Sequence, residues 1–158
     1  MRLALPLILL ASTGLSQIVV PENSRWNEVE SKGDPCKRHE HAFVAVENQF
    51  LALGGRRIQA VDIYDPQSTA WTKGQEPPIE LHHFQALSHQ GKVLVAGAFT
   101  GKFPAETPVD RLYYYDPSSD RWSEGPEIPA DRRRGSVTRG GTETDTMLRI
   151  PVAELEDR

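Results

Sequence analysis

One short stretch of this chain occurs twice, and this repetition constrains the fold more than any other feature. Residues 64–71 read YDPQSTAW, and residues 115–122 read YDPSSDRW. The similarity continues upstream, because residues 39–55 align with residues 82–98 without a gap. A chain of 158 residues that carries two such copies is expected to build two similar units that need each other as neighbours.

Each copy has the pattern of four short strands. An apolar run meets a polar turn, Glu47-Asn48 or Gln90-Gly91, and then resumes, which predicts two strands joined by a tight hairpin. A third strand is expected to end at the repeated tyrosine, and a fourth is expected to begin at the repeated tryptophan. The sequence therefore predicts an all-β fold made of four-stranded antiparallel units.

The repeated residues suit the ends and faces of such strands. An Asp-Pro pair favours a turn, because proline presets φ and aspartate accepts hydrogen bonds from the backbone two residues on. Glycines that close the second strand permit positive φ or close backbone approach. Tyrosine and tryptophan offer large apolar surfaces on which neighbouring sheets can stack. The motif comprises Gly54, Gly55, Tyr64, Asp65, Pro66 and Trp71 in the first copy and Gly97, Tyr115, Asp116, Pro117 and Trp122 in the second.

These residues resemble the kelch-repeat family of β-propellers, in which each repeat of about 50 residues forms one four-stranded blade. The resemblance covers roughly residues 26–134, and the second copy departs from the family pattern at Ala98, where a second glycine is expected. It implies an all-β partial β-propeller with two four-stranded antiparallel blades and flanking partial strands. Blade 1 is expected over residues 38–80 and blade 2 over residues 81–131.

Partial units are expected on either side of the two blades. Residues 17–37 are interpreted as a lead-in with a fourth-strand remnant around Trp26, and residues 132–158 as the start of a further blade followed by an irregular tail. Two blades leave open faces, because repeats need neighbours to bury a continuous core. The chain is therefore interpreted as a truncated, frameshifted or alternatively processed form of a longer propeller that could self-associate through these faces.

The first residues have the layout of a secretory signal peptide. Arg2 precedes an apolar run over residues 3–11, and small residues end near Ser16. Residues 1–16 are therefore predicted to be removed, which leaves a secreted or extracytoplasmic chain without a membrane segment. Cys36 is the single cysteine, so an internal disulfide cannot stabilise the chain.

The charge pattern excludes one class of partner. The net charge is −4, and the basic residues are scattered apart from the triplet Arg132, Arg133 and Arg134. Nucleic acid is not expected as a partner, because phosphate binding needs a concentrated basic surface. The triplet is interpreted as surface at the start of the next blade.

The candidate binding loop lies in the second copy, which has eight extra residues between its second and third strands, within residues 99–111. An insertion confined to one blade maps to a loop on one face, where repeat proteins often bind partners. The loop offers charge and an aromatic surface suited to a protein or glycan partner, with Phe99 and Phe103 expected to be exposed. Its candidate residues are Phe99, Lys102, Phe103, Glu106 and Arg111. The alternative is a tolerated insertion without a ligand.

Histidines raise the question of a metal site. His39 and His41 are expected on one face of a strand, and His82 and His83 begin the second copy. Imidazole binds zinc, copper and iron. However, His39 and His82 occupy the same repeat position, which favours a structural role, so no metal site and no cofactor are predicted.

Enzymatic activity is not predicted, because the sequence contains no phosphate-binding glycine loop, nucleophile elbow or paired-carboxylate pattern. The function expected from the sequence is a noncatalytic secreted binding module. The alternative is a fragment of a carbohydrate-active or galactose-oxidase-like propeller enzyme that lacks its catalytic blades. For this alternative, no tyrosine can be paired with Cys36 from the sequence.

Overall fold

The first sheet is a simple up-and-down arrangement of neighbouring strands. The structure, a computed structural model, describes residues 27–133. Four strands pair antiparallel in chain order to form blade 1: β1 (His41–Val46), β2 (Gln49–Gly54), β3 (Asp62–Asp65) and β4 (Ala70–Lys73). The β1–β2 turn is Glu47-Asn48, as predicted, since Val46 pairs with Gln49.

The second sheet repeats this arrangement and carries an extra hairpin. Blade 2 consists of β5 (Gln85–His89), β6 (Lys92–Ala96), β9 (Arg111–Asp116) and β10 (Arg121–Glu127). The inserted residues form a small two-stranded sheet of β7 (Phe99–Thr100) and β8 (Thr107–Pro108), which the sequence did not predict. A 3-10 turn, η1 (Ala130–Arg132), follows β10. The prediction of an all-β fold with two four-stranded antiparallel sheets is confirmed.

The turn geometry also repeats between the two sheets. Non-glycine residues adopt positive φ at three pairs of equivalent positions: Glu40 and His83, Glu47 and Gln90, and Thr69 and Asp120. Such backbone is uncommon for residues with a side chain. Its recurrence shows that the left-handed residues belong to the repeat itself.

The Asp-Pro turns between the third and fourth strands have the predicted chemistry. The carboxylate of Asp65 accepts hydrogen bonds from the Gln67 backbone N–H at 2.9 Å and from the Ser68 hydroxyl at 2.7 Å. Asp116 accepts corresponding bonds from the backbone N–H and hydroxyl of Ser118, at 2.9 and 2.6 Å. Each aspartate therefore closes its turn by binding the chain two or three residues on.

The glycine that follows β2 is required by space as well as by φ. Gly55 has φ +100°, and a Cβ there would lie 2.8 Å from the His39 carbonyl oxygen. The equivalent Ala98 has no positive φ and is buried, so it follows a more restricted backbone, as expected from its side chain.

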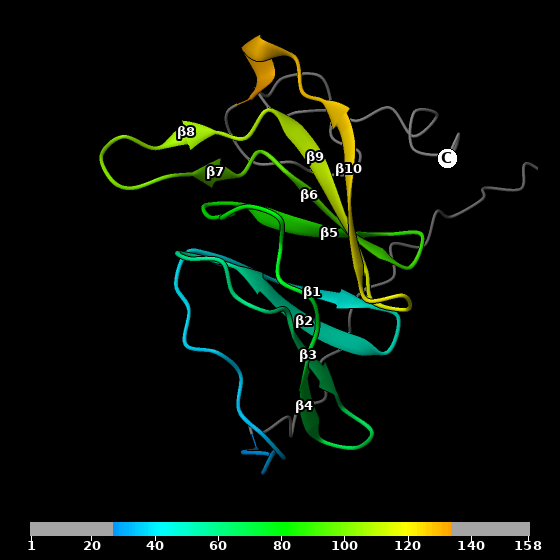
Figure 1. Cartoon of the computed structure of the whole chain (residues 1–158). Coiled ribbons are helices and arrows are strands. Elements are labelled where there is room, and N and C mark those ends of the chain that lie inside the picture. The colour runs from blue at the N-terminus through cyan, green and yellow to red at the C-terminus, as the bar shows by residue number, and fades with distance from the viewer. Residues whose placement is uncertain (1–26, 134–158) are drawn as a thin grey trace, which may run out of the picture.

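The two sheets stack face to face, with β5 above β1 (Figure 1). One core joins them; on the blade 1 side it includes Ala42, Val44, Val46, Leu51 and Leu53, and on the blade 2 side Phe84, Val93, Val95, Tyr113 and Tyr115. Tyr115 is fully buried, and its partner Trp122 donates a hydrogen bond to the Gln75 carbonyl at 3.1 Å. The repeated aromatic pair of blade 2 therefore packs on the neighbouring sheet, as predicted.

The equivalent aromatic pair of blade 1 lies on the outer face. Tyr64 and Trp71 contact each other with ring centroids 5.0 Å apart and are half-buried. Beside them, Phe43 and Phe50 stack at 5.8 Å with exposed fractions of 59% and 37%. We call these four residues the outer aromatic face.

A buried ion pair fastens the segment before β1 to the sheet of blade 1. Arg38 and Asp62 are almost fully buried and form an ion pair, and Arg38 also donates to the carbonyls of Gly54 at 2.9 Å and Ala60 at 2.7 Å. Lys73 pairs with the other oxygen of Asp62 and lies 3.3 Å from the Cys36 sulfur. Burial raises the pKa of Asp62, but the hydrogen bonds from Lys73 and Arg38 outweigh this effect and leave the pKa lowered.

Several sequence predictions lie outside the described residues. These are the signal peptide over residues 1–16, the strand remnant around Trp26, and the further blade and tail beyond Arg133. Within residues 27–133, the structure contains no helix of the length and apolarity that a bilayer span requires.

Candidate functional site

The insertion of blade 2 folds back as a hairpin at the end of the sheets where β1 and β5 begin. In Figure 1, β7 and β8 project sideways from blade 2. The hairpin is attached to the chain before β5, because His82 and Phe99 exchange two backbone hydrogen bonds of 2.9 and 2.8 Å. Its base is therefore fixed by the backbone, and its tip extends beyond the sheet.

Arg56 connects this hairpin to blade 1. Its guanidinium forms ion pairs with Glu40 of blade 1 and Glu106 of the hairpin, and it donates to the Gly101 carbonyl at 3.1 Å. Hydrogen bonding to Arg56 lowers the pKa of Glu40, and hydrogen bonding to Glu40 and Glu106 raises the pKa of Arg56. The three side chains are largely buried, with exposed fractions of 18% to 28%, so the contact orders the hairpin.

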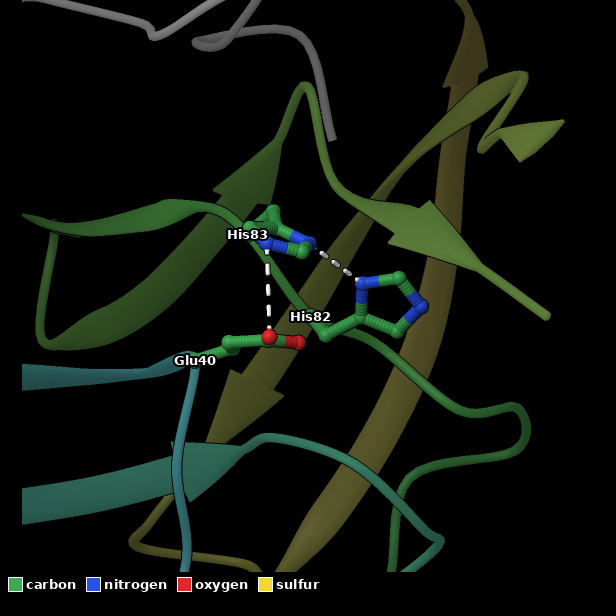
Figure 2. A group of neighbouring side chains, drawn as sticks. All are labelled: Glu40, His82 and His83. Carbon is green, nitrogen blue, oxygen red and sulfur yellow. Dashed lines mark hydrogen bonds and ion pairs between the residues drawn. The ribbon is translucent and has the colours of Figure 1, made fainter. Parts of the chain in front are cut away.

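Two adjacent histidines complete the group. His82 is fully buried, and its Nε2 lies 3.1 Å from the Gly101 carbonyl and 3.5 Å from the Arg56 guanidinium. His83 is 43% exposed, and its Nε2 lies 3.5 Å from Glu40. Figure 2 shows His83 in contact with both of the other side chains. Its Nδ1 lies 2.9 Å from the Nδ1 of His82.

The positions that gather here are equivalent in the two repeats. Glu40 aligns with His83, and Arg56 aligns with Phe99. The backbone N–H of His83 donates to the Glu40 carbonyl at 3.0 Å. Stacking of neighbouring blades brings equivalent positions together, so aligning the copies could have identified Glu40 and Arg56, which the sequence analysis missed.

The predicted binding-loop residues divide into two groups. Phe103 is 81% exposed and Lys102 is exposed, so both lie where a partner can reach them. Phe99 was expected to be exposed, but this is wrong: it is half-buried and contacts the His83 ring edge-on at 6.3 Å. Glu106 is held by Arg56, and Arg111 pairs with Glu124 at 2.5 Å.

The expectation for the first histidine pair is also wrong. His39 precedes β1, which begins at His41, and Glu40 between them has φ 59°. The two imidazoles therefore do not share a face of one strand. His39 and His82 have the same repeat position but different surroundings, because the His39 side chain is 73% exposed and that of His82 is fully buried.

Glu40, His82 and His83 have the chemistry of metal ligands. Each offers one nitrogen or oxygen atom, and these atoms lie within 4.8 Å of one another. Two imidazoles and a carboxylate are ligands that zinc accepts in proteins.

A cleft lies at the opposite end of the sheets. It has a cavity volume of about 480 Å³ between the β1–β2 and β5–β6 turns and the two Asp-Pro turns. Its carboxylates include Asp65 and Asp116, whose pKa values are lowered by hydrogen bonds from their own turns. These aspartates already have turn-closing partners, so the cleft offers a polar surface with a structural role.

A family model and several individual relatives both indicate that this chain is similar to kelch-repeat proteins. The family described as Kelch motif matches residues 81–129. Alpha-scruin of Limulus polyphemus is 28% identical over 65% of this chain and 12% of its own length. Kelch-like protein 41b of Danio rerio is 22% identical over 87% of this chain and 22% of its length. Kelch-like protein 35 of Mus musculus is 31% identical over 54% of this chain and 15% of its length. The chain therefore corresponds to less than a quarter of each of these relatives.

Proposed function

This chain is a kelch-repeat protein, and from that premise we propose that it is a noncatalytic binding module that recognises a protein partner through the β7–β8 hairpin. Kelch-repeat proteins generally mediate protein interactions. The hairpin is the part of blade 2 that has no counterpart in blade 1, so it is a suitable place for specificity.

The observation that carries this proposal is an exposed aromatic side chain on an ordered support. Phe103 is 81% exposed at the hairpin tip, next to the exposed Lys102. Its hairpin is held at the base by the His82–Phe99 backbone bonds and at the side by Arg56. An ordered loop loses less conformational entropy on binding than a flexible one. An aromatic side chain that becomes buried in the interface often contributes much of the binding energy.

The chemistry favours a protein surface with an apolar pocket and a nearby carboxylate. Phe103 would fill the pocket, and Lys102 would pair with the carboxylate at the rim. Such a rim pair affects association rate and salt dependence more than affinity.

Peptides selected from a displayed random library against the full chain would test this proposal. We expect peptides that lose binding to Phe103→Ala while retaining binding to Phe43→Ala, which removes an exposed phenylalanine from the outer aromatic face. A loss of at least about tenfold corresponds to about 1.4 kcal/mol. Peptides that bind both variants equally, or binding seen only on a glycan array, would contradict the proposal.

The outer aromatic face supports a proposal of self-association. The equivalent face of blade 2 is buried against blade 1, whereas Phe43 and Phe50 remain exposed. A second copy is the proposed occupant, since it carries a sheet of the same repeat type. Sedimentation velocity should show a concentration-dependent dimer that Phe43→Ser with Phe50→Ser weakens. A wild-type chain that stays monomeric at all concentrations would exclude this proposal.

Export is proposed from the amino-terminal sequence alone. Its support is the basic, apolar and small-residue order of residues 1–16. Expression in a secreting host, followed by amino-terminal sequencing of protein from the medium, should give a chain that begins near Gln17. An intact amino terminus on protein retained inside the cell would contradict export.

A further inference from the structure

We propose that Glu40, His82 and His83 form a binding site for a divalent transition-metal ion, with Zn²⁺ as the favoured ion. The three ligand atoms lie within 4.8 Å of one another, although Glu40 and the histidines are more than 40 positions apart in the chain. Two imidazoles and one carboxylate provide three protein ligands, and such zinc sites leave a fourth position for water or another ligand.

The surroundings of His82 orient it as a ligand. Its Nε2 lies 3.1 Å from the Gly101 carbonyl, an acceptor that requires an N–H there. When Nε2 carries the proton, Nδ1 of the neutral ring carries a lone pair, and this Nδ1 faces His83. A hydrogen bond from the far nitrogen of an imidazole to a carbonyl is the usual way in which a protein fixes a metal-binding tautomer.

The orientation of His83 completes the argument for a cation. Its Nε2 faces a Glu40 oxygen at 3.5 Å, and its Nδ1 lies 2.9 Å from the His82 Nδ1. In either neutral tautomer of His83, one ring nitrogen presents its lone pair to another lone pair: Nδ1 to that of His82, or Nε2 to the Glu40 oxygen. A cation bound between these atoms removes that repulsion. Zn–N bonds of about 2.0–2.1 Å allow one ion to contact both nitrogens.

The local charge also favours a cation. Glu40 and Glu106 surround Arg56, and the Glu80 carboxylate lies 3.9 Å from His82. Three carboxylates with one guanidinium leave an excess of negative charge, which a divalent ion offsets. Arg56 binds Oε2 of Glu40 and leaves Oε1 directed toward His83, so it supports the ligand without occupying the same oxygen.

The site has both a rigid side and an accessible side. His82 is fully buried, whereas 43% of the His83 side chain is exposed. An ion can therefore enter past His83 and meet a preformed partner. His39 and His82 share a repeat position, but the ligand group depends on Glu40 and His83, which meet only when the blades stack.

Titration of the full chain with ZnCl₂, followed by calorimetry, tests the site. We expect one equivalent to bind, and we expect Co²⁺ at the same site to give the visible absorption of a low-coordinate complex. His83→Asn removes one ligand while retaining a residue that tolerates positive φ. Glu40→Gln removes another. Each should weaken Zn²⁺ binding by at least the roughly 10–100-fold seen when supporting residues of metal sites are changed.

His89→Asn and Cys36→Ser are the matched controls, because they change other candidate ligands outside the group; His89 lies at the far end of β5. Both controls should bind Zn²⁺ like the wild type, and circular dichroism should show that every variant keeps its β structure. The proposal is overturned if the wild type takes up no stoichiometric metal. It is also overturned if a folded His83→Asn variant binds normally, or if either control removes binding.

Discussion

Replacing Asp62 with asparagine should destabilise the chain strongly, because it removes the charge that balances a buried arginine. Asp62 is fully buried, and its carboxylate receives hydrogen bonds from Arg38, Lys73 and the Cys36 backbone N–H, the last at 2.9 Å. The variant keeps an oxygen for some of these donors but leaves the guanidinium without a counter-charge.

The size of the effect follows from the burial of each partner. The Arg38 side chain is 2% exposed and cannot return to water, whereas Lys73 is 44% exposed and can. Breaking a buried ion pair by removing one partner typically costs about 3–5 kcal/mol. The carbonyls of Gly54 and Ala60 still accept from Arg38, so we expect a loss near the lower end, about 3 kcal/mol.

Urea unfolding of the full chain, followed by circular dichroism, measures this loss as a change in the free energy of unfolding. Asp110→Asn is the matched control, because Asp110 is 52% exposed and pairs with Arg111 at 3.5 Å on the surface. It should cost less than about 1 kcal/mol. If Asp62→Asn and Asp110→Asn lose equally little stability, the reasoning about the buried pair is wrong.

The pH dependence of the same group has a definite sign. The pKa of Asp62 is lowered in the folded chain, so folding is favoured while the carboxylate is ionised. The stabilisation should be fully present above the ordinary aspartate pKa and should be lost as pH falls through the lower folded value. In Asp62→Asn, this part of the acid sensitivity should disappear.

Three further predictions concern the repeat and the hairpin. Burial raises the pKa of Tyr115, and its hydroxyl donates to Asp120 at 2.8 Å. Ultraviolet titration should therefore count the same number of ionising tyrosines in the folded wild type and in folded Tyr115→Phe, and one more in the wild type once both are unfolded. Stability should fall as pH rises above the ordinary tyrosine pKa of about 10. Equal tyrosine counts for the two folded proteins agree with this, whereas a lower count in folded Tyr115→Phe refutes it. Gly55→Ala should cost about 1–3 kcal/mol in urea unfolding, because φ is +100° and the new Cβ would lie 2.8 Å from the His39 carbonyl oxygen; a cost no larger than that of Ala98→Gly would count against this. Arg56→Ala should speed tryptic cleavage after Lys102 because the hairpin loses its link to blade 1, while Arg57→Ala, at the next, exposed position, should leave the rate unchanged; equal rates in the two variants would show that Arg56 does not order the hairpin.

The strands and turns were predictable because they depend on neighbouring residues. The alternation in β1 leaves Ala42, Val44 and Val46 buried, and the Asp-Pro turns close on residues two or three positions away. Two tandem copies strengthened the prediction, since the same local pattern had to serve the same structure twice. The inserted hairpin was missed because its strands have only two residues each, too few for a period to be visible.

The sequence by itself therefore determined the repeat, the four-strand units and the aromatic surfaces on which the sheets stack, because each depends on short-range spacing. Only the tertiary structure decided which residues of the two copies meet. Arg56 reaches Glu106 across 50 positions, and His83 reaches Glu40 across the boundary between the blades. Such contacts depend on how closely the sheets stack and on the left-handed backbone at Glu40 and His83, and neither leaves a periodic pattern in the chain.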